Sequence, residues 1–163
     1  MIYAGTSGFS YDDWVGVFYP RGMPRREWLS YYAREFNAVE INSTFYALPR
    51  LSTMESMIGK TGEGFLFSIK ANKEMTHQRQ GSRDLFVAFS RMLQPFITSG
   101  KLGCVLAQFP YSFTPNHQNQ QYLLFMRQQL EGLPLVIEFR NVQWLQQGIF
   151  DWLRQHDVGF CCV

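Results

Sequence analysis

The sequence predicts an α/β fold of the TIM-type (β/α) barrel class, and two regularities of the 163-residue chain lead to this prediction. Short apolar runs of strand length alternate with longer helical stretches, and the strands are spaced roughly 25 to 35 residues apart, which is typical of βα units and too long for hairpins. In addition, polar side chains recur on one face of several strands, toward their carboxyl ends. Parallel strands with polar carboxyl ends are the arrangement that barrel enzymes use.

Six strands and five helices are expected in alternation. The strands are predicted at Ile2–Gly5, Ala38–Asn42, Phe65–Lys70, Gly103–Phe109, Leu135–Phe139 and Val158–Val163. The helices are predicted near Arg25–Phe36, Ser52–Ile58, Asp84–Ile97, Asn119–Leu130 and Gly148–Gln155. No Pro/Ser-rich linker or charge block divides the chain. We therefore expect one incomplete TIM-barrel domain over residues 1–163.

The loop after the first strand and the number of strands separate two parallel architectures. A doubly wound open sheet normally carries a G-x-G-x-x-G turn after its first strand, and the run Gly5–Ser10 (GTSGFS) lacks that spacing. A complete barrel has eight βα units in about 250 residues. About six are expected here, because the chain stops at Val163 inside the sixth predicted strand. The predicted barrel is truncated, and self-association through its open sheet edge is possible.

Composition and charge narrow the class of partner. The net charge of +2, from 15 basic and 13 acidic residues, gives no electrostatic argument for a nucleic-acid partner. Three cysteines without a C-x-x-C pair predict neither a disulfide framework nor a zinc site, but small, buried apolar side chains in strands. No apolar run approaches the roughly 20 residues that span a bilayer, and no signal peptide opens the chain. We expect a cytoplasmic protein without a membrane partner.

Side-chain alternation along the strands is the observation that predicts a site. Successive residues of a strand face opposite ways, so Glu40 and Asn42 share one face while Val39 and Ile41 share the other. The same alternation collects on the polar face the side chains Ser68, Lys70, Gln108, Glu138 and Arg140. Most of them lie toward the carboxyl ends of their strands. Barrel enzymes build their active sites at that end.

These residue types suggest acid/base chemistry on a polar ligand. The candidate catalytic residues are Glu40, Lys70, His77 and Glu138, and the candidate substrate-binding residues are Thr6, Ser7, Asn42, Gln108, Arg140 and Trp144. The carboxylates are candidate general acids or bases, the cations candidate anion binders, and His77 a candidate proton carrier. The charges of Glu40, Lys70, Glu138 and Arg140 sum to zero. An alternative is therefore that these side chains only pair with one another inside the barrel and bind no ligand.

Two further alternatives involve a metal or a covalent intermediate. Carboxylates and an imidazole suit a divalent metal, but the neighbouring cations oppose it, so no metal or other cofactor is expected. Lys70 could also act as a Schiff-base nucleophile if it were desolvated. The tyrosines and tryptophan of the first loop, Tyr11, Trp14 and Tyr19, either wall a pocket or cover the barrel end.

Several of these segments together resemble one family. The segments are GTSGFS from Gly5, VEINSTFY from Val39, FSIKA from Phe67, Thr76-His77, Gln108-Phe109-Pro110 and Glu138-Phe139-Arg140. They are similar, in order and across nearly the whole chain, to the YecE-like proteins, also called domain of unknown function 72. The resemblance implies a TIM-type barrel of cytoplasmic bacterial type with no securely established activity. It also implies longer chains, with further strands beyond the position of Val163.

Three functions follow as hypotheses. The first is an enzyme, possibly a hydrolase, lyase or isomerase, acting on a small polar or anionic metabolite of the sugar or sugar-phosphate type. The second is a non-catalytic barrel whose charged mouth binds a metabolite or a protein. The third is a nucleic-acid-processing barrel, supported weakly by the scattered residues Arg21, Arg25, Arg26 and Arg34, which fit a solvated surface better.

Overall fold

A single parallel sheet of six strands organises the molecule, which is described from a computed structural model covering residues 1–80 and 82–162. The strands are adjacent in chain order, β1-β2-β3-β4-β5-β6, and every pair is parallel. They are β1 (Gly5–Ser7), β2 (Ala38–Ile41), β3 (Leu66–Lys70), β4 (Leu102–Phe109), β5 (Leu135–Phe139) and β6 (Gly159–Phe160). Sequential parallel order with helical crossovers confirms the α/β, TIM-barrel-like class predicted from the sequence.

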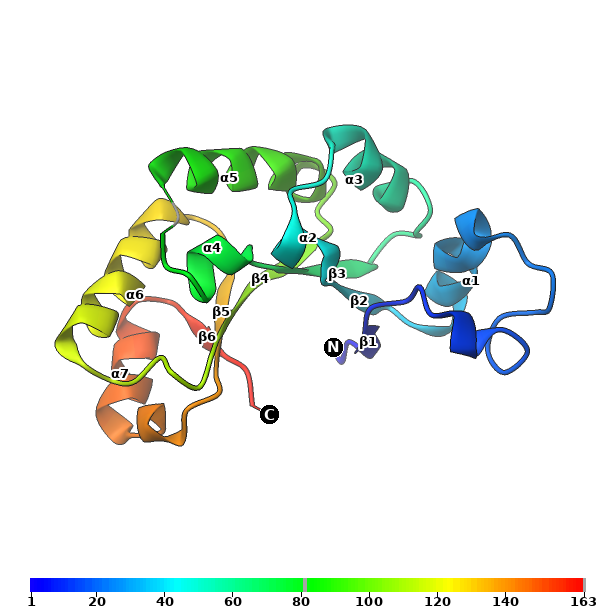
Figure 1. The fold of residues 1–163 in the computed structure, drawn as a ribbon. Coiled ribbons are helices and arrows are strands. Elements are labelled where there is room, and N and C mark those ends of the chain that lie inside the picture. Colours follow the sequence, from blue (N-terminus) through cyan, green and yellow to red (C-terminus); the bar gives the residue numbers. More distant parts are fainter. Residues whose placement is uncertain (81, 163) are drawn as a thin grey trace.

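Helices connect the strands and cover one side of the sheet. They are α1 (Trp28–Glu35), α2 (Ser43–Tyr46), α3 (Leu51–Ile58), α4 (Lys73–Thr76), α5 (Arg83–Thr98), α6 (His117–Gln129) and α7 (Gln147–Gln155). Figure 1 shows α1, α3, α5, α6 and α7 following one another around the sheet, while both chain ends lie on the opposite side. The short helices α2 and α4, which the sequence analysis did not predict, follow directly on strands β2 and β3.

The hydrophobic core lies between the sheet and these helices. On β2 and β3 the alternate residues Val39, Ile41, Phe67 and Ile69 are at most 3% exposed. Their counterparts on β4 and β5 are Val105, Ala107, Phe109, Leu135, Ile137 and Phe139. The intervening side chains point to the other face, which is polar at its carboxyl end. The face assignment made from side-chain alternation is therefore confirmed.

The first strand differs from its prediction. It was expected at Ile2–Gly5, but strand pairing covers Gly5–Ser7, and Ile2 is 88% exposed. The Asn37 side chain holds the preceding segment instead, accepting from Ala4 N and donating to Ile2 O. The apolar residues at the chain start suggested a strand, but pairing with Ala38 begins only at Gly5. This shift places Ser7 at the carboxyl end of β1.

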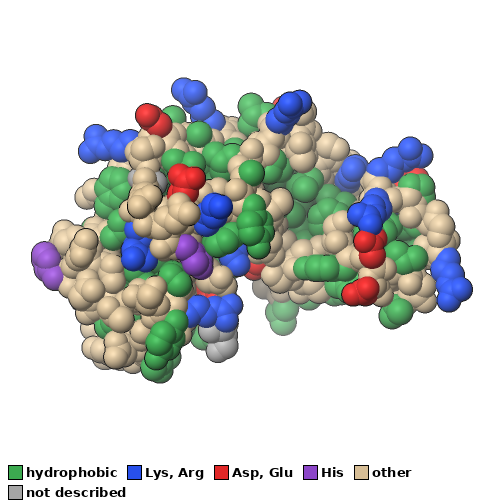
Figure 2. Space-filling model, viewed as in Figure 1, with side chains coloured by type: hydrophobic (Ala, Val, Ile, Leu, Met, Phe, Trp, Pro, Cys, Tyr) green, Lys and Arg blue, Asp and Glu red, His purple; other side chains and the backbone are tan. Residues whose placement is uncertain are grey.

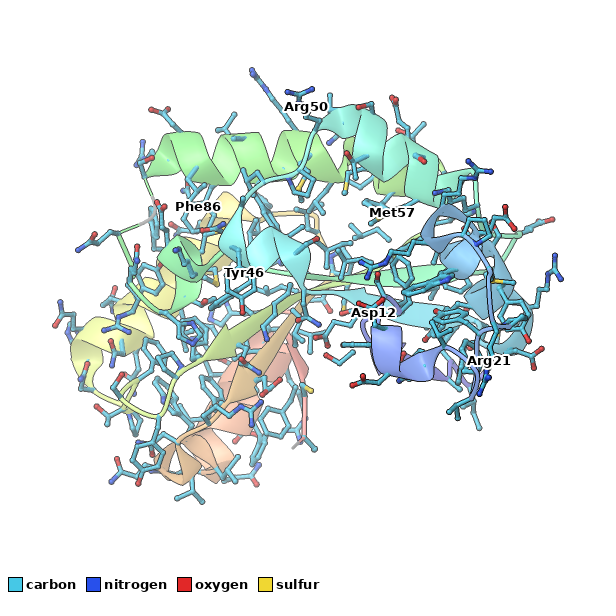
Figure 3. The ribbon with its side chains drawn as sticks, turned by 45° about the vertical axis from the view of Figure 1, so that its right-hand side comes forward. Asp12, Arg21, Tyr46, Arg50, Met57 and Phe86 are labelled. Carbon is cyan, nitrogen blue, oxygen red and sulfur yellow. The ribbon has the colours of Figure 1, made fainter. Side chains whose placement is uncertain are left out.

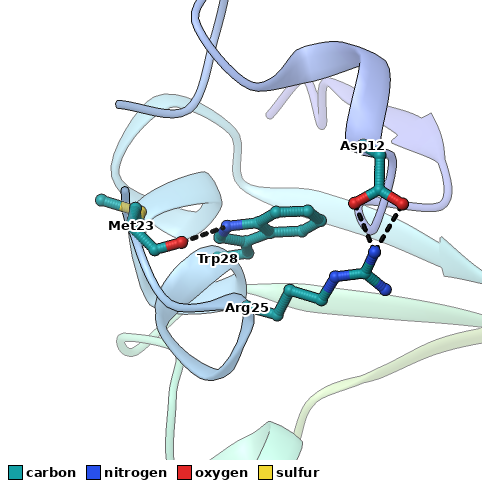
Figure 4. A network of polar contacts seen from close by, with 4 residues as sticks. All are labelled: Asp12, Met23, Arg25 and Trp28. Atoms are coloured by element: carbon teal, nitrogen blue, oxygen red, sulfur yellow. Dashed lines mark hydrogen bonds and ion pairs between the residues drawn. The ribbon is translucent and has the colours of Figure 1, made fainter. Parts of the chain in front are cut away.

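Aromatic packing fixes the long segment between β1 and α1. Trp28, at the start of α1, stacks on Tyr19 with ring centroids 4.7 Å apart. Its indole nitrogen donates to Met23 O, and Arg25 lies over its ring while pairing with Asp12 at 2.5 Å (Figure 4). Both members of this ion pair are about two-thirds exposed, so the stacking of buried rings supplies most of the stability here.

The outer strands β1 and β6 are paired on one side only among the described residues. The sixth strand was expected at Val158–Val163, and the structure assigns Gly159–Phe160; Val163 lies outside the described residues. Self-association through the sheet edge stays a prediction. Within residues 1–80 and 82–162, no helix is long and apolar enough to cross a membrane.

The close approach of β1 to β2 gives a first testable prediction. A Cβ on Gly5 would lie 2.1 Å from the carbonyl oxygen of Ala38, so Gly5→Ala forces the two strands apart. We expect it to lower the free energy of unfolding by about 1–3 kcal/mol, the usual cost of overpacking. Urea denaturation measures the loss. Gly62→Ala is the matched control, since nothing lies within 4 Å of its added Cβ; equal stability of the two variants would contradict the prediction.

Candidate active site

A cavity of about 450 Å³ opens at the carboxyl ends of the first four strands. Its lining residues are Ser7, Tyr11, Asn42, Phe45, Tyr46, Lys70, His77 and Gln108. Five of these, Ser7, Asn42, Lys70, His77 and Gln108, belong to the site predicted from the sequence. Figure 2 shows histidine and basic side chains gathered near the middle of this face of the molecule, and Figure 3 shows Tyr46 on α2 beside the sheet.

Strands β1 and β2 contribute a chain of three hydrogen-bonded side chains. The amide of Asn42 donates to Ser7 Oγ at 3.0 Å, and Ser7 Oγ donates to Glu40 Oε1 at 2.8 Å. The register that pairs Ser7 with Glu40 across the two strands brings these groups together. The Ser7 hydroxyl therefore connects a cavity-lining amide to a carboxylate. Glu40 itself is only half-buried.

Strands β4 and β5 contribute a second cluster, in which Glu138 is the centre. Glu138 is 4% exposed, and its Oε1 accepts from Gln108 Nε2 at 2.7 Å and from Arg140 Nε at 2.6 Å. The Arg140 side chain is 49% exposed, so the ion pair runs from the buried strand end to the surface. A buried carboxylate needs such partners to offset its desolvation. This cluster matches the self-paired arrangement that the sequence left open for Glu138 and Arg140.

Lys70 and His77 meet at the ring of Phe45. Lys70 Nζ lies 5.4 Å from the ring centroid, a cation–π distance, and the His77 ring packs edge-to-face at 4.9 Å. Burial lowers the pKa of His77, and the positive charges of Lys70 and Arg79 lower it further. His77 is therefore neutral at neutral pH and able to accept a proton. Among the described residues Lys70 forms no ion pair, which leaves its charge available to an anionic ligand.

Three predicted binding residues do not line the cavity: Arg140, which pairs with Glu138, and Thr6 and Trp144. Thr6 faces the helices, where its hydroxyl donates to Gly8 O and contacts Tyr32 Oη. Side-chain alternation explains this, because Thr6 neighbours Ser7 within the strand and so points to the opposite face. The prediction of Thr6 as a binding residue is therefore corrected. Because β1 begins later than predicted, Ser7 and not Thr6 lies on the polar face at the end of the strand.

Trp144 is the second correction, because it is a core residue. It is fully buried, stacks on Phe139 with centroids 4.5 Å apart, and donates from Nε1 to Phe113 O at 2.5 Å. The sequence placed it in a loop after β5, where a tryptophan can face either a ligand or the interior. The 3-10 turn Val142–Trp144 directs it inward. Its only polar atom is used in this hydrogen bond, and Trp144 is not among the residues that line the cavity.

The sequence analysis missed the aromatic wall formed by Phe45 and Tyr46. Both belong to α2, the helix that follows β2 without a loop, so their place at a strand end was the available signal. A four-residue helix has no recognisable apolar period, which is why that signal was not used. Of the first-loop tyrosines that were expected either to wall a pocket or to cover the barrel end, Tyr11 lines the cavity. Tyr19 packs in the core.

The cysteines and possible metal ligands add little to the site. Within the described part of the chain, no group of three or more His, Cys, Asp or Glu side chains is arranged to hold a metal ion. Cys104 lies on the polar face, 3.2 Å from Ser68 Oγ, and burial raises the pKa of its thiol. Cys104 is half-buried and Cys162 exposed, so the expectation of buried cysteines was only partly right.

Comparison with known proteins identifies the family. Residues 3–163 match the family described as "Protein of unknown function DUF72". The chain belongs to the DUF72 family. Similar DUF72 relatives include the UPF0759 protein YunF of Bacillus subtilis (33% identity over 157 residues, 93% of this chain and 55% of the relative) and YecE of Escherichia coli K12 (32% over 154 residues, 91% and 52%). The chain thus spans about half the length of the curated relatives it matches.

Solved DUF72 structures share the fold. A crystal structure of a DUF72 protein from Thermotoga maritima has a TM-score of 0.87 and 35% identity, covering 98% of this chain and 64% of that one. A second, from Enterococcus faecalis, has a TM-score of 0.85 at 24% identity, covering 98% and 60%, and supports the fold alone. The resemblance noted in the sequence to YecE-like proteins is confirmed.

The electrostatics of the cavity generate a second prediction. Removing the positive charge in Lys70→Met should raise the pKa of His77 toward its ordinary value of 6.5, because Lys70 lowers it. An NMR titration of the imidazole resonances measures the shift. Lys60→Met, which removes a charge in the segment between α3 and the amino end of β3, should leave the His77 pKa unchanged, because Lys60 is not among the groups that lower it. A His77 pKa that is the same in Lys70→Met and in the unaltered chain would contradict the assignment.

The same lowered pKa sets the sign of a stability effect. A histidine whose pKa is lower in the folded than in the unfolded state stabilises the fold fully above about pH 6.5. That contribution is lost as the pH falls through the folded-state value. We expect His77→Gln to weaken the decrease of stability in this acidic window, as followed by urea denaturation at several pH values.

The burial of Trp144 gives a further prediction. Trp144→Phe removes the hydrogen bond to Phe113 O and leaves that buried carbonyl without this partner, so we expect a loss of about 1–3 kcal/mol in unfolding free energy. The NMR titration of His77 in the cavity should not change, because Trp144 does not line that cavity. Trp152→Phe, at a half-buried ring that packs on His156, is the control and should cost less. An altered His77 titration in a stable Trp144→Phe protein would contradict this placement of Trp144.

Proposed function

We propose that this chain carries the acid/base part of an enzyme site for a small polar or anionic metabolite, of the sugar or sugar-phosphate type. The observation behind the proposal is that Ser7, Asn42, Lys70 and Gln108, from four successive strand ends, line one cavity together with His77. A cavity of about 450 Å³ is within the range that small ligands occupy. The chain spans about half the length of its curated relatives. Any activity of a whole DUF72 protein is therefore proposed and not an established property of this chain.

The charge of the cavity lining favours an anionic group on the ligand. Among the lining residues Lys70 is the only one charged at neutral pH, because His77 is held neutral. No carboxylate belongs to the lining of this cavity: Glu40 and Glu138 are hydrogen-bonded to the lining residues Ser7 and Gln108. An anion that enters the cavity therefore meets a cation and neutral hydrogen-bond donors. Ring hydroxyls of a sugar suit the amides of Asn42 and Gln108.

Proton transfer can involve one residue that lines the cavity, His77, and two carboxylates that are bonded to lining residues. His77 is neutral and lines the cavity, which fits a general base at neutral pH. Glu40, reached through the Ser7 hydroxyl, and Glu138, reached through Gln108, are the carboxylates that polarise those contacts. In this scheme Arg140 pairs with Glu138 at 2.6 Å and orients its carboxylate, and the exposed guanidinium supports binding of negative charge.

The prediction that tests catalysis concerns Glu138. Glu138→Gln keeps the shape and one hydrogen-bond acceptor for Gln108, so the fold should persist, while the charge that orients Arg140 is lost. We expect turnover to fall by roughly 10- to 100-fold, as the loss of a charge-assisted hydrogen bond of about 1.5–3 kcal/mol implies, because Gln108 loses the carboxylate that polarises its contact. The assay is product formation, followed by NMR, from a panel of aldose and ketose monophosphates. Glu131→Gln, at an exposed residue after α6, is the control.

Two outcomes would contradict this assignment. Full turnover in a folded Glu138→Gln protein would remove Glu138 from the mechanism. Saturable binding of the sugar phosphates without turnover in the unaltered chain would favour the non-catalytic binding barrel instead. Circular dichroism and urea denaturation establish that each variant is folded before the kinetics are compared.

A further inference from the structure

The side chain of His77 is held on two sides by residues outside the strands. Its Nδ1 lies 3.0 Å from Thr76 Oγ1, and its ring meets Phe45 at an interplanar angle of 83°. The backbone is held as well, because Arg79 Nη1 donates to His77 O at 3.2 Å. Arg79 adopts a left-handed conformation, with φ of 54°, that side chains rarely take without such contacts. The ring nitrogen left for a ligand in the cavity is Nε2.

The single hydroxyl proton of Thr76 decides which hydrogen bonds Thr76 and His77 can form. Thr76 is 1% exposed, and its Oγ1 is within hydrogen-bond distance of two atoms, His77 Nδ1 and the Asn72 carbonyl oxygen at 3.4 Å. A hydroxyl carries one proton, and a carbonyl oxygen only accepts. Both contacts are hydrogen bonds at once only if Thr76 donates to Asn72 O and accepts from a protonated Nδ1. That arrangement places the imidazole proton on Nδ1.

The opposite tautomer forms one hydrogen bond fewer, although Asn72 O keeps the bond that it accepts from Met75 N at 2.9 Å. If the Thr76 proton pointed to an unprotonated Nδ1, the contact between Oγ1 and Asn72 O would have no proton. His77 Nε2 would then carry the N–H and could not accept a proton from a ligand. The neutral state of the ring makes the choice meaningful, because a charged imidazolium carries protons on both nitrogens.

We propose that Thr76 is a positioning residue that fixes His77 in the Nδ1–H tautomer and leaves Nε2 unprotonated toward the cavity. This deepens the proposed function, on which it rests, by naming the atom that accepts the proton. Thr76 acts through His77 and does not touch the ligand. The short helix α4 contributes by bringing Asn72, Thr76 and His77 within one turn, and the Asn72 side chain caps that turn by accepting from Glu74 N.

The test reads the tautomer directly. In the whole ¹⁵N-labelled chain at about pH 8.5, well above the ordinary histidine pKa, long-range ¹H–¹⁵N correlation NMR distinguishes protonated from unprotonated ring nitrogens. We expect Nδ1 protonated and Nε2 unprotonated. Thr76→Val keeps the side-chain shape but removes the hydroxyl, and should shift the tautomer ratio toward Nε2–H by about tenfold, as the loss of one hydrogen bond implies. Thr76→Ser should restore the original ratio.

Each outcome bears on the proposal separately from catalysis. An Nε2–H tautomer in the unaltered chain would overturn it, and that spectrum suffices even if Thr76→Val does not fold. An unchanged ratio in a folded Thr76→Val protein would also overturn it, because a structural role for Thr76 would not set the tautomer. If the tautomer follows the expectation while inorganic phosphate fails to bind and no sugar phosphate is turned over, the positioning role stands and the proposed function fails.

Discussion

The opposite orientation of successive side chains along parallel strands is the constraint on which the rest of this structure depends. One row of side chains, from Val39 to Phe139, is buried under the helices and forms the sheet side of the hydrophobic core. The other row is thereby released from packing against helices and can be polar. Parallel pairing in chain order then brings the carboxyl ends of neighbouring strands to one edge. A single burial requirement thus produces both the core and the row of polar groups at the site.

The site divides into two clusters with different electrostatics. Around Glu138 the charges are paired, since a buried carboxylate and a half-exposed guanidinium are 2.6 Å apart. Around Phe45 the charges are not paired, since Lys70 and His77 both contact the Phe45 ring. The carboxylates Glu40 and Glu138 are bonded to Ser7 and Gln108 instead. Two cations close together would repel, and the neutral state of His77 removes that repulsion. Gln108 links the clusters, because it lines the cavity and donates to Glu138.

The sequence predicted the parts of this arrangement that follow from period and strand order. The strand-end residues Asn42, Lys70 and Gln108 were found by alternation alone, and the fold class by the spacing of apolar runs. The errors share one cause, which is that local pattern does not define where pairing begins or how a loop turns. Thr6 was misplaced because the residue at which β1 begins is set by its pairing with β2. Trp144 was misplaced because the Val142–Trp144 turn directs its side chain into the core. Phe45 was missed because one helical turn carries no period.

The proton affinity of His77 depends both on its burial and on the charges around it. Lys70 and Arg79 keep its pKa low, and burial adds to their effect. An anion held by Lys70 would cancel part of the positive potential at the imidazole, so the pKa of His77 would rise when a ligand binds. A base whose proton affinity increases when its substrate is bound is better matched to proton transfer from that ligand. The lysine would then have two effects, attracting the anion and adjusting the base, and the shared Phe45 ring keeps the two groups close enough for both.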